Sequence, residues 1–103
     1  MKTPTEYMEE VKQWANTDDR ILALGLIGSH ARKQATAKSD IDFVIICEDP
    51  LKLIKDLSWI SQFGEVKSHI KERWGIVTSI RVFYNDGQEI EFGLKSGQIS
   101  RLM

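Results

Sequence analysis

The sequence has little cysteine, little proline, almost no net charge and no long hydrophobic run. Its single cysteine, Cys47, cannot form a disulfide within the chain, which excludes a disulfide-stabilised scaffold and fits a small core residue in a reducing compartment. A formal net charge of -1 excludes the basic surplus that is typical of nucleic-acid binders, so nucleic acid is not an expected partner. We find neither a signal peptide nor an apolar run long enough to span a membrane. We therefore expect a cytoplasmic protein with no membrane partner.

The length of 103 residues indicates one domain, residues 1–103. A chain of this size can bury one hydrophobic core, but it has no room for a second, substrate-binding domain. The two prolines both stand where a helix is expected to begin. Thr3-Pro4-Thr5-Glu6 combines a capping box with proline at the first helical position, and apolar residues at helical spacing follow Pro50. These patterns predict two main helices, Pro4–Ala15 and Pro50–Ser61.

Apolar runs predict four strands: Ile21–Ile27, Ile41–Cys47, Ile76–Tyr84 and Gln88–Leu94. Residues 65–75 have a weak pattern, for which we expect a short strand followed by a loop. The last two strands are joined by Asn85-Asp86-Gly87, a strong hairpin signal. If all three of these residues lie in the turn, Val82 faces Ile90 and Arg81 faces Glu91, which keeps apolar residues on one side of the hairpin.

The most informative motif is Gly28-Ser29, followed after ten residues by Asp40-Ile41-Asp42 at the start of an apolar strand. Side chains two apart on a strand leave the same face, so Asp40 and Asp42 present two carboxylates side by side, as in a divalent-metal site. A glycine turn that opens a short helix offers free backbone N–H groups to a phosphate. Together the two features indicate nucleotide chemistry. If both serve one triphosphate, the strands 21–27 and 41–47 must run antiparallel.

The segment GSHARKQATAKSDIDFVII resembles the nucleotidyltransferase superfamily that includes DNA polymerase beta, and especially its small bacterial members. The resemblance implies an α+β nucleotidyltransferase fold, with a mixed, mostly antiparallel sheet of about three to five strands flanked by helices. It also implies transfer of a nucleoside monophosphate, in our interpretation AMP, from a nucleoside triphosphate to a hydroxyl group. Two Mg²⁺ ions would assist, with Mn²⁺ as a possible substitute.

Carried over residue by residue, the resemblance makes Gly28 and Ser29 phosphate contacts and makes Asp40 and Asp42 catalytic metal ligands. The related families place a third carboxylate in the middle of a later strand, which here is Glu91. Glu89 lies on the same face of that strand, so alternation alone does not separate the two glutamates.

Basic and polar residues around the motif are candidates for nucleotide binding. Arg32 lies one helical turn after Ser29 and is expected to donate to a β- or γ-phosphate. Lys38 and Ser39 border the aspartates and are either nucleotide contacts or parts of a solvated loop. Arg81 is either a phosphate ligand or a partner that keeps Glu91 ionised.

The sequence leaves three interpretations of the function. Antitoxins of the HEPN/MNT toxin–antitoxin type share the spacing of this motif and modify a tyrosine on a partner toxin, so a partner protein or a homodimer is expected to supply the hydroxyl. The first alternative is a small-molecule adenylyltransferase of the aminoglycoside type. The second is a non-catalytic nucleotide-binding module that serves as a protein partner. The base, the acceptor and the oligomeric state stay open at this point.

Overall fold

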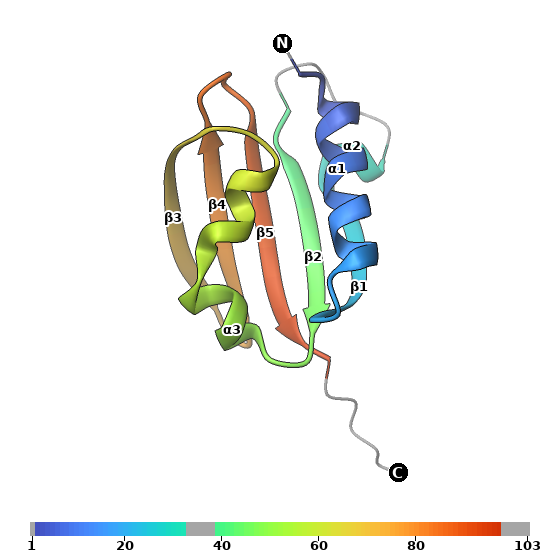
Figure 1. The fold of residues 1–103 in the computed structure, drawn as a ribbon, viewed down its shortest axis with the longest axis vertical. Helices are drawn as coiled ribbons and strands as arrows, with labels where there is room; N and C mark the ends of the chain where they lie inside the picture. The colour runs from blue at the N-terminus through green and yellow to red at the C-terminus, as the bar shows by residue number, and fades with distance from the viewer. Residues whose placement is uncertain (1, 33–38, 98–103) are drawn as a thin grey trace.

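A computed structural model describes residues 2–32 and 39–97, which form a five-stranded mixed sheet with helices against one face (Figure 1). The elements are α1 (Pro4–Thr17), β1 (Ile21–Ile27), α2 (Gly28–Ala31), β2 (Ile41–Cys47), α3 (Pro50–Lys55), the 3-10 helix η1 (Leu57–Gln62), β3 (Val66–Trp74), β4 (Val77–Tyr84) and β5 (Glu89–Ser96). The strand order is β1-β2-β5-β4-β3. Neighbouring strands are antiparallel except β2 and β5, which are parallel. The predicted α+β class with a mixed, mostly antiparallel sheet is therefore confirmed.

The predicted pairing of strands is also confirmed. β1 and β2 run antiparallel, with Ile27 opposite Asp42. In the hairpin of β4 and β5, Val82 lies opposite Ile90 and Arg81 lies opposite Glu91, as expected for a turn that contains all of residues 85–87. None of the helices in the described ranges is long and apolar enough to cross a membrane.

Two sequence-based expectations were wrong in detail. The expected helix Pro50–Ser61 is divided at Asp56, whose carboxylate accepts a hydrogen bond of 3.0 Å from the backbone N–H of Ser58 and so caps a new helix, η1. The segment 65–75 is not a short strand followed by a loop. It forms the nine-residue strand β3. A turn at Gly75, where φ is +63°, leads from β3 into β4, and the two strands pair along the length of β3.

The core lies between the helices and one face of the sheet. From α1, Tyr7, Val11 and Trp14 are buried. The indole of Trp14 stacks on Trp59 at a centroid distance of 4.9 Å, and Trp59 meets the ring of Phe92 on β5 edge-on at 5.0 Å. Alternate residues of β2 complete this layer, because every second side chain of the strand is buried.

The other face of the sheet carries the charged residues of the central strands. Since Ile41, Phe43 and Ile45 point into the core, Asp42 must leave the opposite face of β2. The same alternation places Glu91 on that face of β5, between the buried residues Ile90 and Phe92. The longer helices α1 and α3 lie against the core side, as Figure 1 shows. The polar face therefore stays accessible.

We expect Trp59→Ala to destabilise the fold strongly. Trp59 is 1% exposed, and its indole N–H donates to the backbone O of Leu53 at 2.9 Å. The substitution removes a large core side chain and leaves that carbonyl without its donor, so the free energy of unfolding should fall by about 3–5 kcal/mol. Urea denaturation followed by circular dichroism measures this change. The control Ile76→Ala, at a position 78% exposed, should change it by less than about 0.5 kcal/mol. Equal effects of the two variants would contradict this account of the core.

Candidate active site

Gly28 is fixed by two constraints at the point where β1 becomes α2. Its φ is +78°, which residues with a side chain rarely adopt. A Cβ at this position would also overlap Oδ2 of Asp42, and it would lie 3.3 Å from Cγ of the same residue. Only glycine therefore allows the backbone of this turn to approach the Asp42 carboxylate so closely.

Strand pairing aligns the acidic residues in one row across the sheet. Asp42 on β2 lies opposite Ile27 on β1 and beside Glu91 on the parallel strand β5. Glu91 in turn lies opposite Arg81 on β4. Because directly paired residues project from the same face, Asp42, Glu91 and Arg81 meet on the open side of the sheet. The Gly28 turn joins them there, since it closely approaches Oδ2 of Asp42.

Arg81 forms ion pairs with three carboxylates, those of Asp40, Glu89 and Glu91. Together with Asp42 they make up the acidic row. The Nη1 of Arg81 lies 3.3 Å from Oδ2 of Asp40 and also pairs with Oε2 of Glu89, while its Nη2 lies 3.0 Å from Oε1 of Glu91. Of the two roles considered for Arg81 from the sequence, the structure shows the partnership with Glu91. Both oxygens of Glu91 are engaged, since Oε2 accepts a hydrogen bond of 2.9 Å from the hydroxyl of Ser79.

Asp42 stands in a strongly negative environment. Burial raises its pKa, and the nearby charges of Glu91 and Asp40 raise it further, as does a hydrogen bond with Glu91. The charge of Arg81 acts in the opposite direction but does not cancel these effects. Arg81 thus lies among four carboxylates, those of Asp40, Asp42, Glu89 and Glu91, and this grouping of negative charge attracts cations.

The donor chemistry of the row fits a hard divalent cation, although its arrangement is not that of a completed metal site. Among the residues that the structure describes, no group of three or more Asp, Glu, His or Cys side chains is placed to hold a metal ion. Asp40, Asp42 and Glu91 nevertheless supply carboxylate oxygens, which Mg²⁺ prefers, beside a backbone turn that closely approaches Asp42. Two of these three carboxylates are paired with Arg81, so a bound cation would have to compete with the guanidinium.

Of the other residues predicted for nucleotide binding, those that the structure describes lie in or next to α2 and just before β2. Ser29 lies in α2. Arg32 is the residue after the end of α2, and its backbone N–H donates to the O of Gly28 at 3.2 Å. Ser39 is half-buried before β2, and its O accepts from Nε2 of Gln88 at 3.5 Å. Lys38 lies outside the described residues. The predicted roles of all these residues in catalysis, nucleotide binding and metal binding stay predictions.

Two features of the site were not found from the sequence. Ser79 was not considered, although it lies two residues before Arg81 and so shares its face of β4, which was the available signal. The ion pair of Glu89 with Arg81 was also missed. Glu89 and Glu91 therefore both form ion pairs with Arg81, but only Glu91 lies beside Asp42 in the register of the sheet.

Comparison with known proteins identifies the family and the fold. The sequence model of the streptomycin adenylyltransferase family matches residues 1–99. None of the curated proteins matches the chain.

Among solved structures, the chain is similar to an aminoglycoside 6-adenyltransferase from Bacillus subtilis, with a TM-score of 0.75 and 19% identity over 93% of this chain and 36% of that one. It is also similar to the conserved protein GrpB from Enterococcus faecalis, with a TM-score of 0.63 and 18% identity over 91% of this chain and 56% of that one. The CD-NTase CdnG of Bradyrhizobium diazoefficiens, solved in complex with GTP, has a TM-score of 0.56 and 18% identity over 95% of this chain and 32% of that one.

The chain thus spans about a third of the first and third of these structures and about half of the second. The solved structures share the fold of the sheet and helices. Because the family match extends over residues 1–99 and so includes both aspartates and Glu91, the chain belongs to the streptomycin adenylyltransferase family.

Proposed function

We propose that this chain transfers a nucleoside monophosphate, AMP from ATP, to a hydroxyl acceptor. The observation that carries the proposal is the approach of the Gly28 backbone to Asp42, in register with Glu91. This arrangement can hold a phosphate group and a cation side by side. Membership of an adenylyltransferase family supports the same reaction and favours adenine as the base.

Asp40, Asp42 and Glu91 would hold the divalent cations, two Mg²⁺ or Mn²⁺ ions in the proposed reaction. Bound there, the metal supplies neutralisation of phosphate charge and lowers the pKa of the acceptor hydroxyl. The backbone N–H groups of Gly28 and Ser29 and the Ser29 hydroxyl bind phosphate oxygens, and Arg32 adds a charge-assisted donor. Lys38 and Ser39 complete the proposed nucleotide contacts.

Arg81 keeps the acidic row assembled when no nucleotide is bound. Its ion pairs with Asp40, Glu89 and Glu91 offset part of the repulsion among these carboxylates. If Asp40 and Glu91 held a cation, Arg81 would lose these two ion pairs but keep its ion pair with Glu89, and so would stay beside the site. Ser79 holds Glu91 in place through this exchange by its hydrogen bond to Oε2.

A partner protein or a second copy of the chain supplies the acceptor in this proposal. The longer helices α1 and α3 cover the core side of the sheet, so the proposed route for an incoming hydroxyl is the opposite face, which carries the row. The row is acidic, which disfavours the phosphate backbone of a nucleic acid as the acceptor. An external protein surface would provide the positioning energy that this face lacks.

A hydroxyl of an aminoglycoside is the second candidate acceptor. It is favoured by the family match and by the similarity to the Bacillus subtilis aminoglycoside 6-adenyltransferase. The chain covers only 36% of that enzyme, however, so the fold alone does not bring an aminoglycoside-binding region with it.

The acceptor is tested by incubating the chain with ATP and Mg²⁺ in the presence of streptomycin, of another aminoglycoside, or of candidate partner proteins. We expect slow turnover with the antibiotics and a mass increase corresponding to AMP on a protein hydroxyl. Rapid adenylylation of a free antibiotic would instead favour the second candidate. Absence of nucleotide binding altogether would contradict both.

We expect Glu91→Gln to reduce turnover far more than Glu89→Gln. Both variants remove one charge that pairs with Arg81, so the second controls for the loss of that ion pair. Only Glu91 lies beside Asp42, and its loss should lower kcat by roughly 100-fold, about 3 kcal/mol of transition-state stabilisation, with little change in nucleotide affinity. Pyrophosphate release measures turnover. The reverse order would assign the third catalytic carboxylate to Glu89.

We expect Asp42→Asn to leave the metal-free protein as stable as the wild type, or more so. The substitution removes a charge next to Glu91 and Asp40, and an amide can still donate to Glu91. It should also abolish the rise in melting temperature that Mn²⁺ with ATP gives the wild type. Thermal melts with and without metal and nucleotide test both effects. Asp19→Asn, at an exposed position, is the control and should keep the full metal response. A full response in Asp42→Asn would remove Asp42 from the site.

A further inference from the structure

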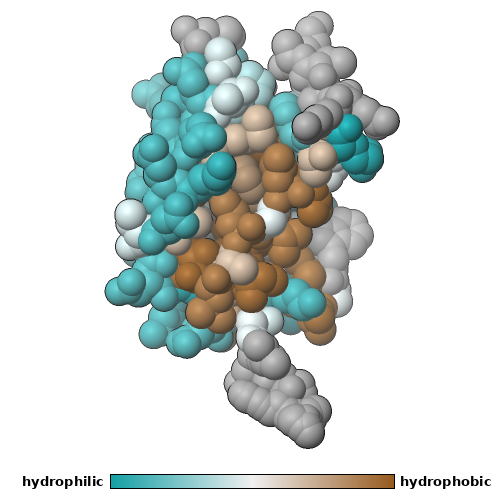
Figure 2. Space-filling model, turned by 90° about the vertical axis from the view of Figure 1, so that its right-hand side faces the viewer, coloured by the Kyte–Doolittle hydropathy of each residue, from teal (hydrophilic) through white to brown (hydrophobic). Residues whose placement is uncertain are grey.

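β1 is an edge strand whose own side chains carry no charge that would protect the edge. Its sequence, ILALGLI, contains no charged or polar side chain, and the strand order leaves its outer side unpaired in the described chain. Leu22 is 52% exposed and Ile27 is 49% exposed. Figure 2, which faces this edge of the molecule, shows hydrophobic residues gathered in one continuous area with hydrophilic surface beside it.

The opposite edge of the sheet differs in chemistry. β3 carries Lys67, Lys71, Glu72 and Arg73, all exposed. Charged residues on an edge strand prevent pairing with other chains, and β3 is protected in this way. The one irregularity of β1 is a bulge between Ile21 and Ala23, which leaves Ala23–Ile27 in regular pairing with β2. A regular, exposed, uncharged edge is the signature of a strand that pairs with a partner.

We propose that β1 pairs antiparallel with β1 of a second copy of this chain, about a two-fold axis at Gly25. Gly25 is the centre of the regular segment Ala23–Ile27. This register places Gly25 opposite Gly25 of the second copy and Leu24 opposite its Leu26. It also places Ala23 opposite its Ile27, so that a small side chain meets a large one. The two five-stranded sheets then continue as one sheet.

Charge and symmetry favour a second copy as the occupant. Pairing β1 with itself brings no charged side chain into register, because the segment 21–27 has none. Pairing β1 with β3 of another molecule would place Lys71 and Arg73 beside an apolar strand. It would also leave one β1 edge free to pair with a further molecule, whereas pairing of β1 with itself uses the β1 edges of both copies and closes after two.

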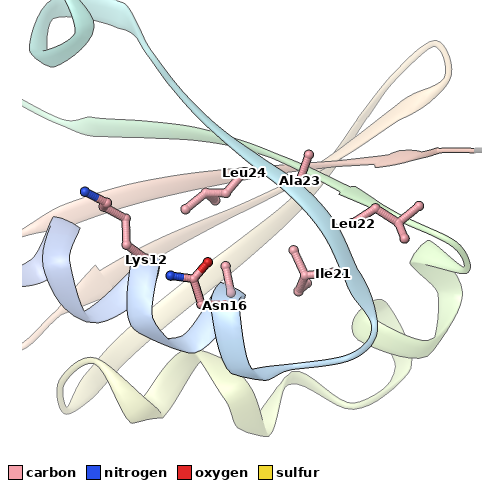
Figure 3. Close-up of a pocket in the computed structure, with 7 residues that line it drawn as sticks. Lys12, Asn16, Ile21, Leu22, Ala23 and Leu24 are labelled. Carbon is pink, nitrogen blue, oxygen red and sulfur yellow. The ribbon is translucent and has the colours of Figure 1, made fainter.

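A cavity beside β1 offers room for the second copy. It has a volume of about 200 Å³ and lies between α1 and β1, with Lys12 and Asn16 on one wall and Leu24 on the other (Figure 3). In the proposed register, Leu26 of the second copy lies opposite Leu24 and can extend its side chain into this space. The pairing thus buries apolar area on the helix side of the sheet as well as at the edge.

Gly25 allows a sharp test. A Cβ built at Gly25 meets no heavy atom within 4 Å, and its φ is not in the left-handed region, so Gly25→Lys fits the single chain. In the dimer, the same change sets two lysines directly opposite each other at the axis, where like charges repel. We expect the wild type to sediment as a dimer and Gly25→Lys to sediment as a folded monomer at the same concentration.

Ile76→Lys is the matched control. Ile76 is 78% exposed at the turn between β3 and β4, so the variant adds the same charge to an apolar surface far from β1 in the strand order. It should stay dimeric. A monomeric wild type, or dissociation by Ile76→Lys but not by Gly25→Lys, would overturn the proposal.

A cysteine at the axis tests the register itself. Directly opposite residues of an antiparallel pair have Cα atoms about 4.5–5.5 Å apart, within the range that a disulfide bridges. Gly25→Cys should therefore form a covalent dimer with oxidised glutathione, whereas the wild type, whose described cysteine Cys47 is buried, should not. A dimer in solution without this cross-link would contradict pairing about Gly25. These measurements need no nucleotide, so their outcome is independent of the proposed function.

Discussion

The parallel pairing of β2 with β5 is the constraint on which the candidate site depends. It sets Asp42 beside Glu91, and the antiparallel neighbours on either side add Gly28 after Ile27 and Arg81 opposite Glu91. The core enforces this register, because Ile41, Phe43, Ile90 and Phe92 are all buried on the other face. A slip by one residue would turn the carboxylates into the core and the apolar side chains into water. The same hydrophobic alternation that stabilises the sheet therefore assembles the acidic row.

The fold supplies a cation within the acidic row, the guanidinium of Arg81. Two carboxylates 4 Å apart repel each other by roughly 4 kcal/mol at an effective dielectric constant of 20. Arg81 offsets part of this repulsion for Asp40, Glu89 and Glu91, whereas Asp42 keeps a raised pKa, caused first by burial and then by the charges of Glu91 and Asp40. In the described residues, Arg81 thus pairs with the carboxylates around Asp42, and its charge lowers the pKa of Asp42 without cancelling the increase. This balance suits a site that binds metal together with a nucleotide rather than permanently.

Much of this arrangement follows from the sequence, and the exceptions have physical causes. The antiparallel β1–β2 pair was predictable because the Gly28-Ser29 turn and the aspartates were expected to serve one triphosphate. The register of the β4–β5 hairpin was predictable because burial leaves one turn length for Val82 and Ile90. The length of β3 was not, since an edge strand rich in charge shows no apolar alternation. The division of the second helix at Asp56 depends on one capping hydrogen bond. The three-way pairing of Arg81 depends on side-chain geometry that strand patterns do not encode. The roles of the site residues in catalysis remain predictions from family resemblance.

The geometry of the sheet determines how the proposed dimer would arrange the two sites of the proposed reaction. In an antiparallel pair about an axis perpendicular to the sheet, directly opposite residues share a face, so the acidic rows of both copies open on the same side. Gly28 lies three residues from Gly25, so the two Gly28 turns would be separated along the strands by about 20 Å, at a rise of about 3.3 Å per residue. Each site then stays accessible, and neither copy covers the row of the other. The joined open faces form one broad surface, which matches a macromolecular acceptor better than a small molecule, since a protein can contact that surface widely while presenting one hydroxyl to one site.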